Sequence, residues 1–132
     1  MLFFSSRNDQ DHKRLEAAVH RVIPENKIEL FKRLDDFGER LRMPVEPDSI
    51  AVLSASNRNE LQQIRLLCNL LTEIYVILVI PDRKDSTIKL AHLLLPRFLS
   101  QKEDDFANLK IVLNKMYQNS QNPHNRLLFQ ES

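Results

Sequence analysis

The stretch Ile74-Tyr-Val-Ile-Leu-Val-Ile80 decides the fold of this chain. It is apolar throughout and rich in β-branched residues, which is typical of a strand that is buried on both faces. Pro81 follows at once and predicts the end of the strand, because proline cannot donate a hydrogen bond to a neighbouring strand. Strands of this kind occur mainly in parallel sheets that helices cover on both sides. We therefore expect an α/β protein.

Working outward from this strand, shorter apolar segments predict four more strands, at residues 2–4, 27–31, 49–53 and 97–99. In five other segments the apolar residues recur every three to four positions, which is the pattern of amphipathic helices. In the first of these segments the apolar stripe consists of Leu15, Ala18, Val19, Val22 and Ile23. The expected helices cover about residues 11–23, 34–41, 57–72, 88–95 and 106–116.

Polar residues before these segments predict where the helices begin. Asp11 is expected to cap the first helix. Asn57 with Glu60, and Ser100 with Glu103, have the spacing of a capping box, in which each side chain accepts a hydrogen bond from the other residue's backbone N–H.

Five strands that alternate with five helices imply parallel strands joined by right-handed crossovers. The segment lengths predict a flavodoxin-like, doubly wound five-stranded parallel sheet of order 2-1-3-4-5, with helices on both faces. We expect one domain over residues 1–117 and a polar C-terminal tail over residues 118–132. The apolar run Arg126-Leu-Leu-Phe129 in this tail can dock on the domain, reach a partner or stay disordered, and the sequence leaves these alternatives open.

The composition excludes several classes of function. Nineteen basic and eighteen acidic residues give a net charge of +1 without a basic stripe, so we expect no binding to nucleic acid or to an anionic membrane. Gly38 is the one glycine, which argues against glycine-rich phosphate loops. The lone Cys68 cannot form an intrachain disulfide, and no apolar run is long enough to span a bilayer. We expect a cytoplasmic protein with no cofactor.

The order and length of these elements resemble the receiver domain of bacterial two-component signalling over about residues 1–117. Residues 28–41 (Ile-Glu-Leu-Phe-Lys-Arg-Leu-Asp-Asp-Phe-Gly-Glu-Arg-Leu) look like its second strand and helix. Residues 90–99 (Leu-Ala-His-Leu-Leu-Leu-Pro-Arg-Phe-Leu) resemble its fourth helix and fifth strand. The resemblance implies an acidic pair that holds Mg²⁺ after strand one and a phosphoryl-acceptor aspartate at the end of strand three. It also implies a hydroxyl after strand four and a lysine after strand five.

This chain departs from that set of residues. Ser54 stands at the end of the third strand, where the family has its acceptor aspartate, and Asp82 stands where the family has a hydroxyl. Asp9 and Asp11 are displaced along the chain from the positions of the acidic pair, and Lys102 only approximates the position of the lysine. We therefore interpret the chain as a pseudo-receiver. It would have a degenerate phosphoacceptor pocket, no catalytic residue and no enzymatic activity.

Two ligand sites remain open alternatives at this pocket. Asp9, Asp11 and Asp82 can form a residual cation site, although a capping role for Asp11 and solvated loop positions for the other two are simpler. Ser54 and Ser56 can bind a small anion near the start of the third helix, although ordinary turn serines are again simpler.

The four histidines show no metal-ligand spacing, so we expect no metal site. They are His12, His20, His92 and His124, of which His20 and His92 are expected on helix surfaces.

The resemblance favours a signalling module that binds a protein partner or a second copy of itself in a homodimer. The fourth helix and fifth strand of receivers often form the dimer surface, which here implies Lys89, His92, Leu93 and Phe98. Phe98 can instead be a packed strand residue. The alternative function is a small-ligand-binding or enzymatic domain on the same scaffold. The lack of a Ser/His/Asp or Cys/His constellation argues against it. Phosphorylation at an unorthodox site is a third hypothesis.

Overall fold

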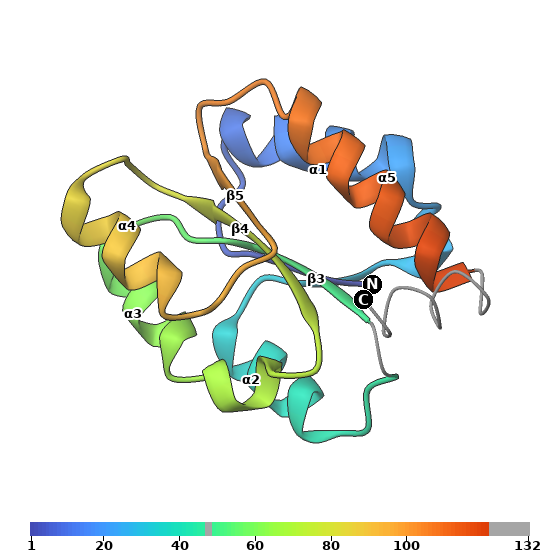
Figure 1. Ribbon diagram of the computed structural model, residues 1–132, viewed down its shortest axis with the longest axis horizontal. Coiled ribbons are helices and arrows are strands. Elements are labelled where there is room, and N and C mark those ends of the chain that lie inside the picture. Colours follow the sequence, from blue (N-terminus) through green and yellow to red (C-terminus); the bar gives the residue numbers. More distant parts are fainter. Residues whose placement is uncertain (47–48, 122–132) are drawn as a thin grey trace.

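The computed structural model describes residues 1–46 and 49–121 of the chain. Its strands and helices alternate as the sequence predicts, with two short 3₁₀ helices (η1 and η2) between them (Figure 1). In chain order the elements are β1 (Leu2–Ser5), α1 (Gln10–Val22), η1 (Glu25–Lys27), β2 (Glu29–Phe31), α2 (Leu34–Arg42), β3 (Ile50–Ser54), α3 (Arg58–Arg65), η2 (Cys68–Leu71), β4 (Tyr75–Ile80), α4 (Asp85–His92), β5 (Phe98–Gln101) and α5 (Ala107–Gln121).

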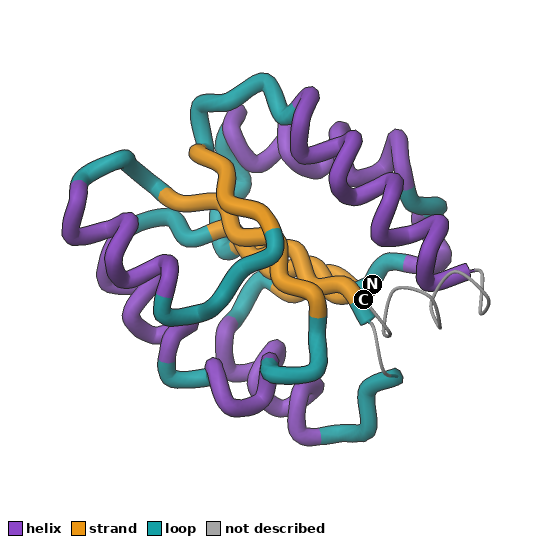
Figure 2. Tube along the Cα trace, in the orientation of Figure 1, coloured by secondary structure: helices purple, strands orange, loops and turns teal. Residues whose placement is uncertain are grey.

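The five strands form one parallel sheet in the order β2-β1-β3-β4-β5, which confirms the predicted flavodoxin-like topology. The sheet lies between two layers of helices (Figures 1 and 2). Helices α1 and α5 cover one face, and α2, α3 and α4 cover the other. No helix within the described part of the chain is long and apolar enough to cross a membrane.

Successive side chains of the central strands point alternately into the two cores. In β4, Leu78 and Ile80 face α2, α3 and α4, whereas Ile77 and Val79 face α1 and α5. Side chains of successive strand residues point to opposite faces, so a strand between two helical layers must be apolar at every position. This requirement explains the unbroken apolar run that predicts β4.

The start of the first helix differs from the prediction. Asp9, not Asp11, is the N-cap of α1, and its carboxylate accepts the backbone N–H of His12 at 3.0 Å. Asp11 lies in the first turn and pairs with Arg14 at 2.7 Å. Both aspartates have the chemistry of a cap, and β1 ends at Ser5, which leaves enough chain for the helix to begin earlier.

The third helix is shorter than predicted. It ends at Arg65, and η2 follows, so the expected continuous helix to Thr72 is wrong. The N–H of Leu67 bonds to the carbonyl of Ile64, which tightens the last turn to i→i+3 bonding. The chain then turns, and Leu71 enters the core. At the start of α3, Asn57 accepts the Glu60 N–H as expected.

The expected capping box of Ser100 and Glu103 is also wrong. Ser100 lies inside β5, where it pairs with Val79 of β4, and α5 begins at Ala107. The Ser100 hydroxyl donates to the carboxylate of Asp104 at 2.9 Å, so the polar residues here form a turn after the strand.

The C-terminal boundary shifts as well. Helix α5 continues to Gln121, so residues 118–121 belong to the helix and not to the expected tail. The rest of that tail, residues 122–132 with the run 126–129 and His124, lies outside the described residues.

Replacing Leu61 by alanine should lower the free energy of unfolding by about 2–5 kcal/mol, because this α3 side chain is fully buried. The matched control is Leu66→Ala at the end of the same helix, where the side chain is 79% exposed. We expect a change below about 0.5 kcal/mol for the control. Urea unfolding followed by circular dichroism measures both variants, and equal losses would contradict the packing of α3.

Candidate functional site

The carboxyl ends of the strands form the edge where ligands bind in sheets of this topology. Ser5 at the end of β1 is level with Ser54 at the end of β3, and Ser54 is level with Val79 of β4. The third strand therefore brings a hydroxyl to the centre of this edge, as the sequence predicts. The predicted pocket residues Asp9, Asp11, Asp82 and Lys102 follow the ends of β1, β4 and β5 at the same edge.

The two acidic residues after β1 already have partners. The Asp9 carboxylate caps α1 and also accepts a hydrogen bond from Arg7 at 3.1 Å. The backbone N–H of His12 and the Arg7 guanidinium hold the pKa of Asp9 below its usual value. Asp11 pairs with Arg14 in the next turn. Both carboxylates thus serve the start of α1, but the cap is Asp9 and not Asp11, to which the simpler interpretation of the sequence assigned it.

Asp82 lies after β4 and forms a tight local turn. Its carboxylate accepts the backbone N–H of Lys84 at 2.9 Å. The nearby Thr87 hydroxyl and then the Lys84 N–H lower the pKa of Asp82 from its usual value. The Thr87 hydroxyl acts by its proximity, because the geometry of a hydrogen bond is not met at Oγ1. Thr87 is fully buried in α4. No sequence pattern indicates this hydroxyl, because it comes from inside a helix and not directly after the strand.

Lys102 follows β5 and is fixed by its backbone. Its N–H donates to the carbonyl of Ile80, and its carbonyl accepts from the Arg14 guanidinium at 3.0 Å. The same guanidinium donates to the Asp104 carbonyl at 3.0 Å and lies 5.7 Å from the centre of the Phe106 ring. A residue of α1 therefore holds the loop between β5 and α5.

The Asp104 side chain completes this loop. Its carboxylate accepts the Gln101 N–H at 3.1 Å and the Ser100 hydroxyl at 2.9 Å. The Gln101 N–H, followed by the Ser100 hydroxyl and the nearby Arg83, lowers the pKa of Asp104 from its usual value.

A buried hydrogen-bonded chain begins at Ser5. Its hydroxyl lies 2.8 Å from Nδ1 of His12, and both residues are buried. Nε2 of His12 lies 2.8 Å from the carboxylate of Glu16 and 3.0 Å from Nζ of Lys32. The sequence predicts no Ser/His/acid constellation, and the structure corrects that prediction. Only the i,i+4 spacing of His12 and Glu16 on a helix could have indicated part of it.

A second bridge closes the edge between β1 and β3. The Glu60 carboxylate accepts the Ser6 hydroxyl at 2.7 Å and the Ser56 N–H at 2.9 Å. Glu60 thus joins the loops that follow both strands.

These contacts decide what the edge can do chemically. The carboxylates of Asp9, Asp11, Glu60 and Asp104 are each bonded to donors of the chain itself. Ser5 cannot reach a substrate, because only 1% of its surface is exposed. Among residues 1–46 and 49–121, no three His, Cys, Asp or Glu side chains come together in a group that could hold a metal ion.

The structure divides the predicted interaction face. Lys89 and His92 are exposed on α4, and Leu93 directly after it is 54% exposed, as expected for a residue off the inner stripe. Phe98 is half-buried and packs in the opposite layer, against the core of α1 and α5. The face therefore consists of the end of α4 without Phe98. His20 is exposed on α1, as predicted.

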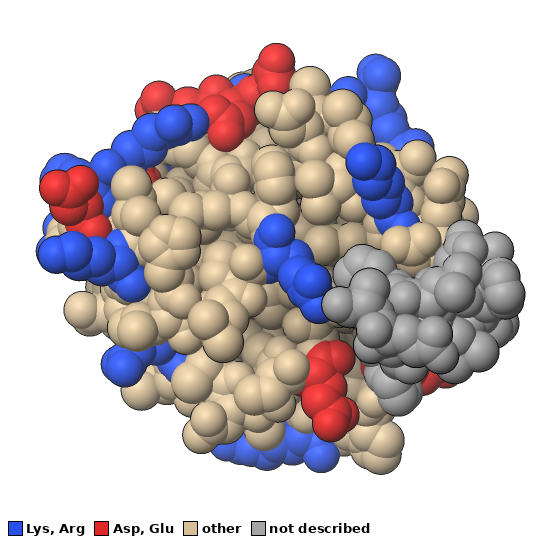
Figure 3. Space-filling view, in the orientation of Figure 1, with Lys and Arg blue, Asp and Glu red and all other residues tan. Residues whose placement is uncertain are grey.

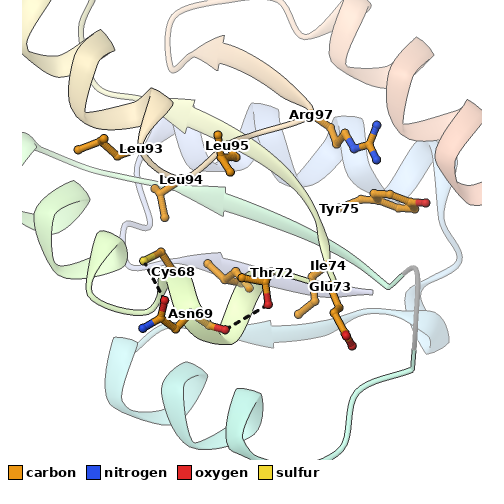
Figure 4. Close-up of a pocket in the computed structure, with 11 residues that line it drawn as sticks. Cys68, Asn69, Thr72, Glu73, Ile74, Tyr75, Leu93, Leu94, Leu95 and Arg97 are labelled. Carbon is orange, nitrogen blue, oxygen red and sulfur yellow. Dashed lines mark hydrogen bonds between the residues drawn. The ribbon is translucent and has the colours of Figure 1, made fainter.

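A hollow of about 700 Å³ lies beside the end of α4 (Figure 4). It is at the amino ends of the strands, whereas Ser54 is at their carboxyl ends. Residues of η2 and the start of β4 form one wall, and Leu94 and Leu95 form the other. The Arg97 guanidinium stacks 4.8 Å from the centre of the Tyr75 ring at its rim. Few charged side chains lie on the face around this hollow (Figure 3). Cys68, which lines it, is half-buried.

Comparisons with known proteins do not assign this chain to a family. No protein-family model matches the chain, and no curated protein matches it significantly.

Asp104→Ala should lower the free energy of unfolding by roughly 1 kcal/mol at neutral pH, because the Ser100 hydroxyl and Gln101 N–H lose their acceptor. The folded pKa of Asp104 is lowered, so its contribution is complete above the unfolded value and is lost as the pH falls through the folded value. The difference from the wild type should shrink below about pH 4. Urea unfolding at several pH values measures it, and a difference independent of pH would contradict this role.

Proposed function

We propose that this chain is a receiver-like domain that has lost phosphoryl transfer and acts by binding a protein through the end of α4. The simplest partner is a second copy of the chain. As a signalling module of this class it would work in the cytoplasm. The observation that carries the first part is the position of Ser54 at the centre of the strand-end edge, where phosphoryl transfer needs a carboxylate.

The chemistry of this edge supports the loss of phosphoryl transfer. An aspartate attacks phosphorus as an anion, whereas a serine hydroxyl must first give up a proton to a base. The acidic residues of the edge accept hydrogen bonds as caps and bridges, which is a poor arrangement for Mg²⁺ binding by two free carboxylates. Arg14 and Glu60 tie the loops around the edge to one another.

Leu95 supports the binding surface. It has a φ of 51°, a left-handed conformation that costs a leucine about 1–2 kcal/mol, and it is 84% exposed. Because the Leu95 side chain is exposed, no burial of it within this chain offsets the conformational cost. Phe106 also has a positive φ, but it is buried and contacts Arg14. Leu93, at the end of α4, is exposed as well and lines the same hollow as Leu95, and exposed apolar patches often bind proteins.

An enzymatic role has weaker support. The chain of Ser5, His12 and Glu16 resembles the constellation that activates a nucleophilic serine, but the Ser5 hydroxyl is enclosed. The hollow beside α4 lies at the opposite ends of the strands from Ser54, and the Arg97 guanidinium at its rim is stacked on the Tyr75 ring. We therefore prefer the binding module.

A phosphoryl mimic tests the loss of phosphoryl transfer. Beryllofluoride with Mg²⁺ should leave the amide NMR spectrum unchanged, because the end of β3 carries the Ser54 hydroxyl where the mimic would need a carboxylate. Acetyl phosphate should add no phosphoryl mass to the protein. Amide shifts clustered around Ser54 and Asp82, or a mass increase, would contradict the proposal.

Sedimentation tests the binding surface. We expect the wild type to form a dimer as its concentration rises. Leu93→Asp should weaken this association at least about tenfold, because a buried unpaired charge is costly. Leu30→Asp is the matched control. Leu30 is 45% exposed, but it lies in β2, the outermost strand on the side of the sheet away from β4 and β5. A wild type that stays monomeric, or equal effects of the two substitutions, would count against the surface.

A further inference from the structure

His12 is a buried titratable group that the proposed binding function leaves unused. Only 4% of its surface is exposed, and it lies in the first turn of α1. Its Nδ1 contacts the Ser5 hydroxyl, and its Nε2 contacts both Glu16 and Lys32. These contacts join three elements, because Ser5 ends β1, Glu16 belongs to α1, and Lys32 directly follows β2.

The two contacts at Nε2 exclude each other. The Lys32 ammonium has only donors, so it needs an unprotonated Nε2 to accept its hydrogen bond. The Glu16 carboxylate has only acceptors at neutral pH, so it needs an Nε2–H that donates. One ring nitrogen cannot satisfy both partners at 2.8 and 3.0 Å in a single protonation state.

We propose that His12 is a proton-operated switch that exchanges Lys32 for Glu16 at Nε2. In the neutral ring, Nδ1–H donates to the Ser5 hydroxyl and Nε2 accepts from Lys32. A proton taken from solvent then binds Nε2, and the imidazolium donates to Glu16 while it repels the Lys32 ammonium. The side chain of Glu16 is 39% exposed and lies 2.8 Å from Nε2, so a proton can pass from solvent to the ring beside it while the core stays closed.

The exchange has a mechanical consequence at the strand-end edge. Lys32 also donates to the carbonyl of Arg7 at 2.8 Å, so in the neutral state it links the segment between β2 and α2 to the loop after β1. When the ring is protonated, Lys32 loses one of its two anchors. The contact between the segment that joins β2 to α2 and the start of α1 then depends on pH.

Few other charges act on the ring. Arg7 and Asp9, in the loop before α1, pair with each other at 3.1 Å, and the ring faces only the uncharged Ser5 and Phe3 on β1. The positive end of the α1 dipole acts with Lys32 against the imidazolium, and Glu16 acts for it. Glu16 and Lys32 therefore decide the outcome, and neither belongs to the surface around Leu93.

Imidazole ¹⁵N NMR over a pH series tests the switch in the wild type, Lys32→Met and Glu16→Gln. At high pH we expect the Nδ1–H tautomer, and at low pH a doubly protonated ring. Lys32→Met should move the pH of the change upward, because the imidazolium loses a neighbouring cation, and Glu16→Gln should move it downward, because the imidazolium loses its anionic acceptor. His92, which is exposed on α4, is the internal control and should not respond to either substitution.

A second measurement tests whether protonation of His12 changes the segment around Lys32. Amide signals of residues 31–33 should change together with the His12 ring in the wild type and lose this dependence in Lys32→Met. Lys32 is exposed and Glu16 only half-buried, so both variants should fold. An Nε2–H tautomer in the wild type at high pH would overturn the proposal. So would a ring titration that Lys32→Met leaves unchanged, or amide signals that titrate equally in both proteins.

Discussion

The burial of β3 and β4 on both faces is the constraint on which the rest of the structure depends. Val52 and Ile77 face α1 and α5, whereas Leu53 and Leu78 face α2, α3 and α4. Neither face tolerates a charge, so all polar chemistry is displaced to the two ends of the strands. The same constraint makes the sheet parallel, because each strand must be followed by a helix that crosses one face. The strand-end edge and the hollow at the other edge are thus products of one packing rule.

The sequence predicts this architecture well, because periodicity reports burial directly. The run at residues 74–80 and the stripe of α1 identify their elements without ambiguity. Boundaries are predicted less well where two local interactions have the same signature. Asp9 and Asp11 can both cap a helix, and a serine followed by acids, as at Ser100, fits a turn as well as a capping box. In such cases the path of the whole chain decides which interaction forms.

The candidate site is predictable only in part. Ser54 follows from the end of a strand, and so does the absence of an acceptor aspartate. The pairing of Lys32 with His12 does not, because the two residues are 20 positions apart and meet only when β2 lies beside β1. The buried Thr87 is hidden for a similar reason, since one hydroxyl inside a helix leaves no pattern in a sequence. Local patterns reveal which residues are polar, and the tertiary fold decides which of them meet.

The Arg14 side chain has a consequence for how the chain assembles. It joins α1 to the loop before α5 by two hydrogen bonds that span 88 and 90 residues of sequence. During synthesis the first helix is made long before that loop leaves the ribosome. Until then the α1 face of the sheet lacks the α5 side chains that complete its core. We expect the N-terminal half to remain exposed to aggregation and to wrong partners for most of translation, since contacts between distant parts of a chain form late.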